Sequence, residues 1–145
     1  MDELHEGGCA CGAVRYRARG KPIVATVCHC AFCRRRLASA FAVLATFPEQ
    51  SMEIMQGELA ECEHRSDESG RWLRMRFCPR CGTTVYHVTE FRPGARTVAA
   101  GTFDDPGWFR IERHIWARSK LPWVEIPPGV EVFAENPPRP QQPPR

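Results

Sequence analysis

Seven of the eight cysteines in this 145-residue chain fall into three short clusters with the spacing of metal ligands. The clusters are Cys9 with Cys11, then Cys28, Cys30 and Cys33, then Cys78 with Cys81. In the last cluster a CxxC spacing followed by a glycine lets two thiolates point at one ion. A CxxC motif can also be a redox pair, but that function is typical of a thioredoxin-like βαβ context, and the flanking segments here resemble strands. The clusters therefore predict zinc binding.

Seven ligands divide most naturally into a site of four and a site of three. Four thiolates close the coordination shell and make a structural site, whereas three protein ligands leave one position for water or substrate. The group of Cys28, Cys30 and Cys33 can form the three-ligand site alone, and the two pairs would then complete each other. His29 is an alternative fourth ligand of this group, although an extended backbone between two ligating cysteines should turn it away.

The short spacing of Cys9 and Cys11 requires a bent backbone. A fully extended strand would hold the two residues about 6.6 Å apart, at about 3.3 Å per residue. Two sulfur atoms on one tetrahedral zinc lie closer, at about 3.8 Å. Gly7, Gly8 and Gly12 flank the pair and supply the freedom to bend. The sequence around the pair therefore agrees with its function as half of a metal site.

Turn residues divide the rest of the chain into short, often alternating segments that are typical of strands. Residues 73–77 alternate apolar side chains with arginines, which indicates one buried and one wet face. Further strands are expected near residues 14–17, 23–27, 83–88, 96–100 and 109–116. Only residues 31–40 have the pattern of a helix, of two or three turns. The proline-rich residues 136–145 are expected to form a disordered tail after one domain of residues 1–135.

Composition and charge argue against several classes of function. The 20 Lys and Arg residues against 17 Asp and Glu give a formal net charge of +3 and are scattered, so a nucleic-acid partner is not expected. Two zinc ions held by seven thiolates would cancel this charge. The longest apolar stretch, residues 37–47, is well short of the about 20 residues of a membrane-spanning helix. The acidic start of the chain is unlike a secretory signal, so a soluble protein of the reducing cytoplasm is expected.

Three ordered cysteine motifs and two later runs resemble one known family. The motifs read GGCACGAVRY, CHCAFCRR and FCPRCGT, and the later runs read GTFDDP and HIWARSKLPWVEI. Over residues 7–133 they closely resemble the glutathione-dependent formaldehyde-activating enzyme (GFA) family, which includes centromere protein V. The resemblance implies a mainly β, Mss4-like fold, which together with the strand pattern predicts zinc-stabilised antiparallel sheets and at most one short helix.

The resemblance also implies two Zn²⁺ ions per chain and assigns their ligands. The structural zinc would be held by Cys9, Cys11, Cys78 and Cys81, and the catalytic zinc by Cys28, Cys30 and Cys33. This agrees with the division into four and three ligands that the spacing suggests. It also assigns the pairing of the first and last clusters, which counting alone leaves as an inference.

The activity that the resemblance implies is a carbon–sulfur lyase reaction that joins glutathione, or a related thiol, to formaldehyde to give S-hydroxymethylglutathione. A three-thiolate zinc suits this chemistry, because an incoming thiol can take the open position and become the nucleophilic thiolate. The ion could instead polarise the aldehyde oxygen as a Lewis acid. The alternative function is a zinc-stabilised binding module without catalysis, the class to which the centromere protein branch points.

Weaker candidates for substrate binding lie outside the cysteine motifs. Arg34 and Arg35 follow the second cluster and could attract an acidic substrate, although a solvated helix face is an equal alternative. The family usually carries an acidic residue near Asp104, and Trp123 belongs to the matching run SKLPW, where it could wall a pocket. Cys62 has no partner at ligand spacing and is expected to be a free thiol. The expected partners are a small thiol and an aldehyde, and homodimerisation stays open.

Overall fold

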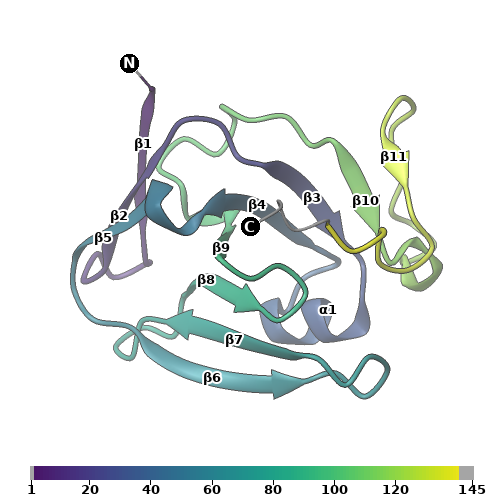
Figure 1. The fold of residues 1–145 in the computed structure, drawn as a ribbon, viewed down its shortest axis with the longest axis horizontal. Helices are drawn as coiled ribbons and strands as arrows, with labels where there is room; N and C mark the ends of the chain where they lie inside the picture. Colours follow the sequence, from purple (N-terminus) through teal and green to yellow (C-terminus); the bar gives the residue numbers. More distant parts are fainter. Residues whose placement is uncertain (1, 141–145) are drawn as a thin grey trace, which may run out of the picture.

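The computed structural model describes residues 2–140 as two β-sheets and one α-helix (Figure 1). The smaller sheet has the order β1-β2-β5, formed by Leu4–Gly8, Arg15–Arg19 and Met52–Gln56. The larger sheet has the order β11-β10-β3-β4-β9-β8-β7-β6. Its strands are β3 (Val24–Cys28), β4 (Ala42–Pro48), β6 (Ala60–Arg65), β7 (Trp72–Phe77), β8 (Thr84–Thr89), β9 (Ala95–Ala99), β10 (Arg113–Ile115) and β11 (Glu131–Val132). The prediction of a mainly β fold is confirmed.

Strand β10 is the exception in an otherwise antiparallel arrangement, because it runs parallel to both β3 and β11. Antiparallel neighbours can be joined by a short turn, whereas a parallel neighbour must come from farther along the chain. In the register of this pair, Arg113 lies opposite Thr26 and Ile115 lies opposite Cys28. The last third of the chain therefore completes the sheet beside β3.

The helix α1 (Ala31–Leu37) is shorter than the residues 31–40 that the sequence predicts. It ends because Ala38 takes the left-handed conformation, with φ of 50°, and its N–H bonds the carbonyl groups of the last turn. The strand expected over residues 109–116 is likewise reduced to β10, and Trp116, with φ of 57°, ends it. Single 3₁₀ turns complete the regular structure at η1 (Glu49–Ser51), η2 (Ala100–Thr102) and η3 (Ala117–Ser119).

The main hydrophobic core lies between the smaller sheet and one face of the larger sheet. Tyr16 of β2, Phe47 of β4 and Val98 of β9 are fully buried in it. Because side chains alternate along a strand, the neighbours Thr46 and Thr97 face the opposite side of the larger sheet. That second face, next to α1, is the one available for a site.

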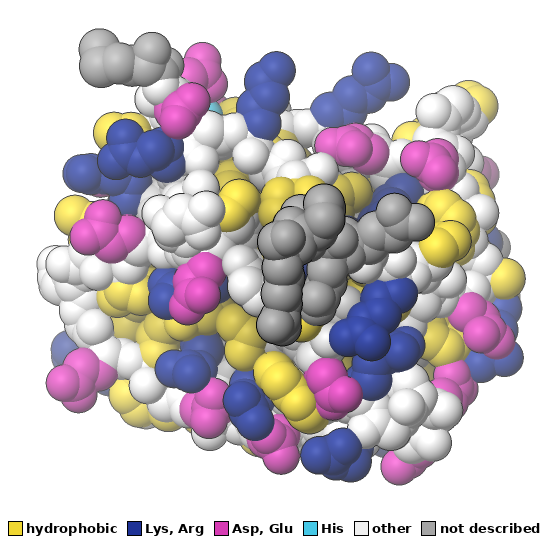
Figure 2. All heavy atoms as spheres, viewed as in Figure 1, with side chains coloured by type: hydrophobic (Ala, Val, Ile, Leu, Met, Phe, Trp, Pro, Cys, Tyr) yellow, Lys and Arg dark blue, Asp and Glu magenta, His cyan; other side chains and the backbone are white. Residues whose placement is uncertain are grey.

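The molecular surface mixes charges of both signs. Figure 2 shows Lys and Arg side chains interspersed with Asp and Glu across the face in view. Several are paired, as in Arg17 with Glu6 at 3.0 Å and Arg74 with Glu63 at 2.9 Å. Within residues 2–140, no helix has the length and apolar character needed to cross a membrane.

Two candidate metal centres and a cavity

The four cysteines of the first predicted centre come together from the two sheets. Cys9 and Cys11 lie between β1 and β2, and Cys78 and Cys81 lie between β7 and β8. All four sulfur atoms lie within 4.8 Å of one another. The sulfur atoms of Cys9 and Cys11 are 3.6 Å apart, and those of Cys11 and Cys78 are 3.8 Å apart. These distances fit a tetrahedral zinc with Zn–S bonds of about 2.3 Å, in which sulfur atoms lie about 3.8 Å apart.

Two turns that each contain a glycine set the geometry of the two cysteine pairs. Gly12 and Gly82 both have φ of 80°, a left-handed conformation that side chains rarely adopt. The N–H of Gly12 donates to the carbonyl of Cys9 at 3.1 Å, and that of Gly82 donates to the carbonyl of Cys78 at 2.8 Å. Each turn therefore folds the chain back so that both of its thiols face the same point.

Hydrogen bonds at the first centre favour the thiolate, the form that binds metal, at Cys9 and Cys81. The backbone N–H of Val14 donates to the sulfur of Cys9 at 3.2 Å. Hydrogen bonds from the side chain and backbone of Thr83 lower the pKa of Cys81 to about 5. The same Thr83 hydroxyl accepts from the N–H of Ala10 at 3.1 Å, so it also ties the two turns together.

The second centre forms where β3 meets α1. The sulfur atoms of Cys28, Cys30 and Cys33 lie within 4.8 Å of one another, and within residues 2–140 no other Cys, His, Asp or Glu joins them. Cys30 caps α1, and its sulfur accepts from the N–H of Cys33 at 3.2 Å. Hydrogen bonds from Cys28 and Cys33 lower the pKa of Cys30 to about 3, so this group holds negative charge. A tetrahedral ion bound here would keep one position open.

His29 is turned away from these sulfur atoms, as the alternation of an extended backbone predicts. Its backbone N–H donates to the carbonyl of Ile115 at 3.0 Å. Its buried ring lies with Nε2 2.9 Å from Nδ1 of His114 and packs against Phe41. The imidazole therefore joins β3 to β10 on the far side of the strand.

A cavity of about 430 Å³ lies beside the second centre, and all three of its cysteines line it. The floor is the second face of the larger sheet, with alternate residues of neighbouring strands pointing into it. The polar residues of this floor are Thr26, Thr46, His87, Thr89 and Thr97. The hydroxyl groups of Thr46 and Thr97 are 3.1 Å apart and hydrogen-bond to each other. The floor can therefore offer hydrogen bonds to a ligand held above the sheet.

Aromatic side chains form the walls of this cavity. Phe32 of α1 stacks on His64 of β6 with ring centroids 3.8 Å apart, which joins the helix to the far edge of the sheet. Trp72, Phe91 and Trp116 line other parts of the wall. Small-molecule sites commonly combine such apolar walls with a few polar groups and have volumes of about 300–1,000 Å³. The cavity has the size and lining of a site for a small organic ligand.

Part of the predicted proline-rich tail contacts the cavity. Asn136 accepts a hydrogen bond from Nε1 of Trp116 at 2.9 Å, and both Asn136 and the buried Pro137 line the cavity. Arg139 donates to a backbone carbonyl in the loop after β8 at 2.9 Å. Residues 141–145 lie outside the described residues, so the extent of the tail and the domain boundary stay predictions.

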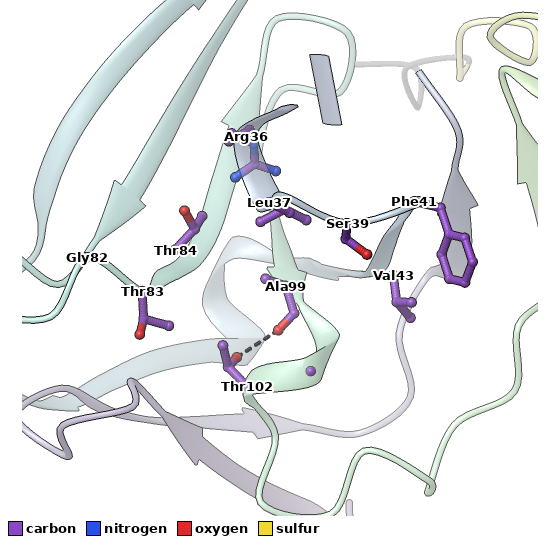
Figure 3. Close-up of a pocket in the computed structure, with 11 residues that line it drawn as sticks. Arg36, Leu37, Ser39, Phe41, Val43, Gly82, Thr83, Thr84, Ala99 and Thr102 are labelled. Atoms are coloured by element: carbon purple, nitrogen blue, oxygen red, sulfur yellow. Dashed lines mark hydrogen bonds between the residues drawn. The ribbon is translucent and has the colours of Figure 1, made fainter. Parts of the chain in front are cut away.

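A second hollow, of about 400 Å³, borders the segments that follow both centres (Figure 3). Arg36 and Leu37 enter it from α1, and Thr83 and Thr84 enter it from the start of β8. The three nitrogen atoms of the Arg36 guanidinium are buried without a hydrogen-bond partner among residues 2–140. No cysteine lines this hollow, so it is separate from the cavity at the second centre.

The predicted substrate-binding residues lie outside the cavity lining. Arg34 and Arg35 are on α1, but neither lines the cavity. Asp104 is held by Arg15 of β2, with Oδ1 2.9 Å from Nη1, and this hydrogen bond lowers the pKa of Asp104. Trp123 is 72% exposed in the loop after η3. Because none of the four lines the cavity, their roles in substrate binding stay predictions.

Sequence reasoning does not mark Arg92 and Arg113, which also line the cavity. For His87 and Trp116, two further lining residues, it favours a packing role, although His87 could face a site. Burial lowers the pKa of His87 to about 3, and the positive charge of Arg36 adds to this shift, so the ring is neutral at ordinary pH. Alternation along β8 places His87 and Thr89 on one face, but the sequence pattern does not indicate that this face carries a site.

This fold and these two cysteine groups define a mainly β protein with two centres that could hold zinc, one closed and one beside a cavity. The family model for the glutathione-dependent formaldehyde-activating enzyme matches residues 4–119, and the chain belongs to this family. The crystal structure of a Rhodobacter sphaeroides protein is similar, with a TM-score of 0.54 and 22% sequence identity over 88% of this chain and 98% of that chain. This likeness shows a shared fold, and the family expected from the sequence is confirmed.

Proposed function

We propose that this protein is a zinc-dependent enzyme of the carbon–sulfur lyase type that joins a thiol to an aldehyde, with glutathione and formaldehyde as the first pair to test. The proposal assigns a structural Zn²⁺ to the four-cysteine group and a catalytic Zn²⁺ to Cys28, Cys30 and Cys33. Membership of the family supports the reaction type and this pair of substrates. Because both centres need reduced thiols, we place the protein in the cytoplasm.

The observation that carries the proposal is a group of three cysteines beside a cavity. Structural zinc sites commonly have four protein ligands, as the first centre offers. The second centre offers three within residues 2–140, and all three line a cavity of about 430 Å³. A binding module without catalysis would require neither the open position nor the cavity.

The reaction itself forms one bond between the thiol sulfur and the carbonyl carbon, and the thiol proton ends on the former carbonyl oxygen. Zinc, when bound, supplies a positive charge that stabilises a thiolate or polarises a carbonyl oxygen. The aromatic wall around Phe32 and Trp116 gives the cavity an apolar side against which a substrate can pack. The hydroxyl groups of Thr46 and Thr97 and the neutral ring of His87 can form hydrogen bonds with the substrate oxygen that receives the proton.

The test is the rate at which formaldehyde exchanges with its glutathione adduct. The adduct also forms without an enzyme, so the quantity to measure is the acceleration over the uncatalysed exchange, by NMR with carbon-13 formaldehyde. We expect two zinc ions per chain and accelerated exchange in the zinc-loaded protein. Protein that holds both ions and gives no acceleration would contradict the proposal and favour the binding module.

Two cysteine variants make the test specific. Cys30→Ser should remove the second zinc and the acceleration, because Cys30 is one of only three ligands available there among the described residues. Cys62→Ser is the matched control, since Cys62 is an exposed cysteine that belongs to neither group. This control should keep both ions and the full rate.

A further inference from the structure

Two arginines that form no ion pair among residues 2–140 line the same cavity. Arg92 lies in the loop after β8, and Arg113 begins β10. Arg113 donates from Nε to the hydroxyl of Thr26 at 3.0 Å, which fixes the side chain over the sheet. Among residues 2–140, neither arginine forms an ion pair with a carboxylate. Both therefore bring unpaired positive charge to the cavity.

Both arginines of this pair are partly buried, and the charge of Arg92 acts on Arg113. Burial lowers the pKa of Arg92, and burial together with the positive charge of Arg92 lowers the pKa of Arg113. Arginine nevertheless stays protonated in proteins. The carboxylates of Glu112 and Glu131 act in the opposite direction on Arg113, but neither is close enough to form an ion pair. Two partly desolvated like charges are unfavourable, and an anion placed between them would relieve this cost.

The acidic residues at the cavity do not neutralise the pair. Asp67 and Glu68 belong to the loop between β6 and β7. Glu68 is already paired with Arg118 at 3.0 Å. Asp67 forms no ion pair among residues 2–140, so neither loop carboxylate is paired with the two arginines.

The arginine pair lies a short distance along the sheet from the second centre. In the parallel register of β3 and β10, Arg113 is opposite Thr26, and Ile115 is opposite Cys28. Two residues along a strand correspond to about 6.6 Å, at about 3.3 Å per residue. Thr26, Cys28, Arg113 and Ile115 all line the cavity, so they share one face of the sheet. An anionic group bound at the arginines would thus lie about 6.6 Å along the sheet from the cysteines of the second centre.

We propose that Arg92 and Arg113 form a carboxylate-binding subsite, which makes the site selective for thiols that carry a carboxylate several bonds from the sulfur. The planar guanidinium group binds a carboxylate through two parallel hydrogen bonds, which gives direction as well as charge. This inference rests on the proposed function, because it takes the cavity to be where the thiol binds. It assigns substrate selection to residues of the sheet and not to Arg34 and Arg35.

Binding of glutathione and of its diethyl ester to the zinc-loaded protein, measured by calorimetry, tests the subsite. The ester keeps the thiol and the peptide but has no carboxylate. We expect glutathione to bind at least about tenfold more tightly than the ester, as for hydrogen bonds to a charged group. We also expect the affinity of glutathione to fall with added salt, whereas that of the ester, which keeps only its ammonium charge, should not fall.

Three variants decide which residues are responsible. Arg113→Gln and Arg92→Gln should each weaken glutathione binding by about tenfold and reduce its advantage over the ester. Arg92 lies in a loop, so its replacement leaves the strands of the sheet intact. Arg110→Gln is the matched control, because Arg110 is exposed and does not line the cavity. Equal affinity of acid and ester, no binding of either, or unchanged affinity in both cavity variants would overturn the subsite.

Turnover separates this inference from the proposed function. If the diethyl ester reacts as efficiently as glutathione, the subsite is wrong while the proposed reaction stands. If glutathione binds in an arginine-dependent manner but no accelerated exchange occurs, the subsite stands and the proposed reaction is wrong.

Discussion

The buried guanidinium of Arg36 has no hydrogen-bond partner among the described residues, which is costly for a charged group. Its positive charge acts on two neighbours: it opposes the rise in the pKa of Cys33 and adds to the lowering of the pKa of His87. Three thiolates around Zn²⁺ would leave the second centre with a net charge of −1. Arg36 is placed to balance that charge, so we interpret it as a residue that supports metal binding without being a ligand.

Replacing Arg36 should therefore weaken zinc binding at the second centre. We expect Arg36→Met to lower the affinity of that ion by about tenfold or more, the usual effect of losing a partner outside the ligand shell. Competition with a chromophoric chelator measures both ions separately. Arg35→Met is the control, because Arg35 is on the same helix but exposed. Equal zinc affinity in the two variants would show that Arg36 has no such role.

The site residues differ in how far the sequence predicts them. The cysteines are predictable because a chelating motif needs only local spacing, as in Cys28, Cys30 and Cys33. Arg92 and Arg113 are not, since nothing in their local sequence indicates that distant strands place them in one cavity. Asp104 lies in a segment with turn composition, and the local sequence does not predict that it accepts a hydrogen bond from Arg15 of β2.

Among the connections between elements, the turn after β5 is the most tightly constrained at a glycine. Gly57 has φ of +85°, and a Cβ at this position would overlap the backbone carbonyl of Ala13. Ala13 follows Cys11 in the turn that carries half of the first centre. The backbone at Gly57, just after β5, therefore packs directly against the turn that carries Cys9 and Cys11.

A methyl group at Gly57 should destabilise the protein more than one at Gly70. Gly70 also has positive φ, +72°, but a Cβ there would have no atom within 4 Å. We expect Gly70→Ala to lower the free energy of unfolding by about 1–2 kcal/mol through backbone strain. Gly57→Ala should lower the free energy of unfolding by the same amount and by about a further 1–3 kcal/mol, because the added methyl group overpacks the turn. Urea unfolding of the zinc-loaded variants measures both, and equal losses would contradict the close approach.

The local sequence pattern predicts which residues form strands better than it predicts which strands pair. Alternation identifies β7, because Leu73, Met75 and Phe77 alternate with arginines. It does not predict that β10 joins β3 in parallel, since that pairing depends on contacts between residues far apart in sequence. The ends of elements are also set by backbone conformation, as Ala38 and Trp116 show with their positive φ.

The whole molecule depends unequally on its two centres. The first centre links the turn of the smaller sheet to a turn of the larger one, whereas the second lies within the larger sheet and its helix. Cys78→Ser should therefore cause loss of the folded state, because the binding of a structural zinc contributes about 10–16 kcal/mol of apparent stability. Cys30→Ser should stay folded. Circular dichroism with zinc analysis measures this contrast, and equal stability of the two variants would contradict it.

The segment after β11 closes part of the cavity through Asn136 and Pro137. A chain truncated after Glu135 loses these contacts and the hydrogen bond from Arg139 to the loop after β8. In protein that keeps the structural zinc but has lost the ion of the second centre, we expect truncation to speed modification of the cavity cysteines by a bulky maleimide severalfold, and by small iodoacetamide much less. A chain ending at Pro140 is the control. Unchanged rates with both reagents would show that the segment does not restrict access.

The positions of the cysteines and of β10 in the sequence determine the order in which the two centres become complete during synthesis of the chain. The members of the second centre lie within six residues, so they are together as soon as Cys33 has been synthesised. The first centre must wait longer, because 67 residues separate Cys11 from Cys78, and the sheet edge beside Cys28 waits for β10. A growing chain therefore presents its three-cysteine group to the metal pool before the fold that encloses it exists.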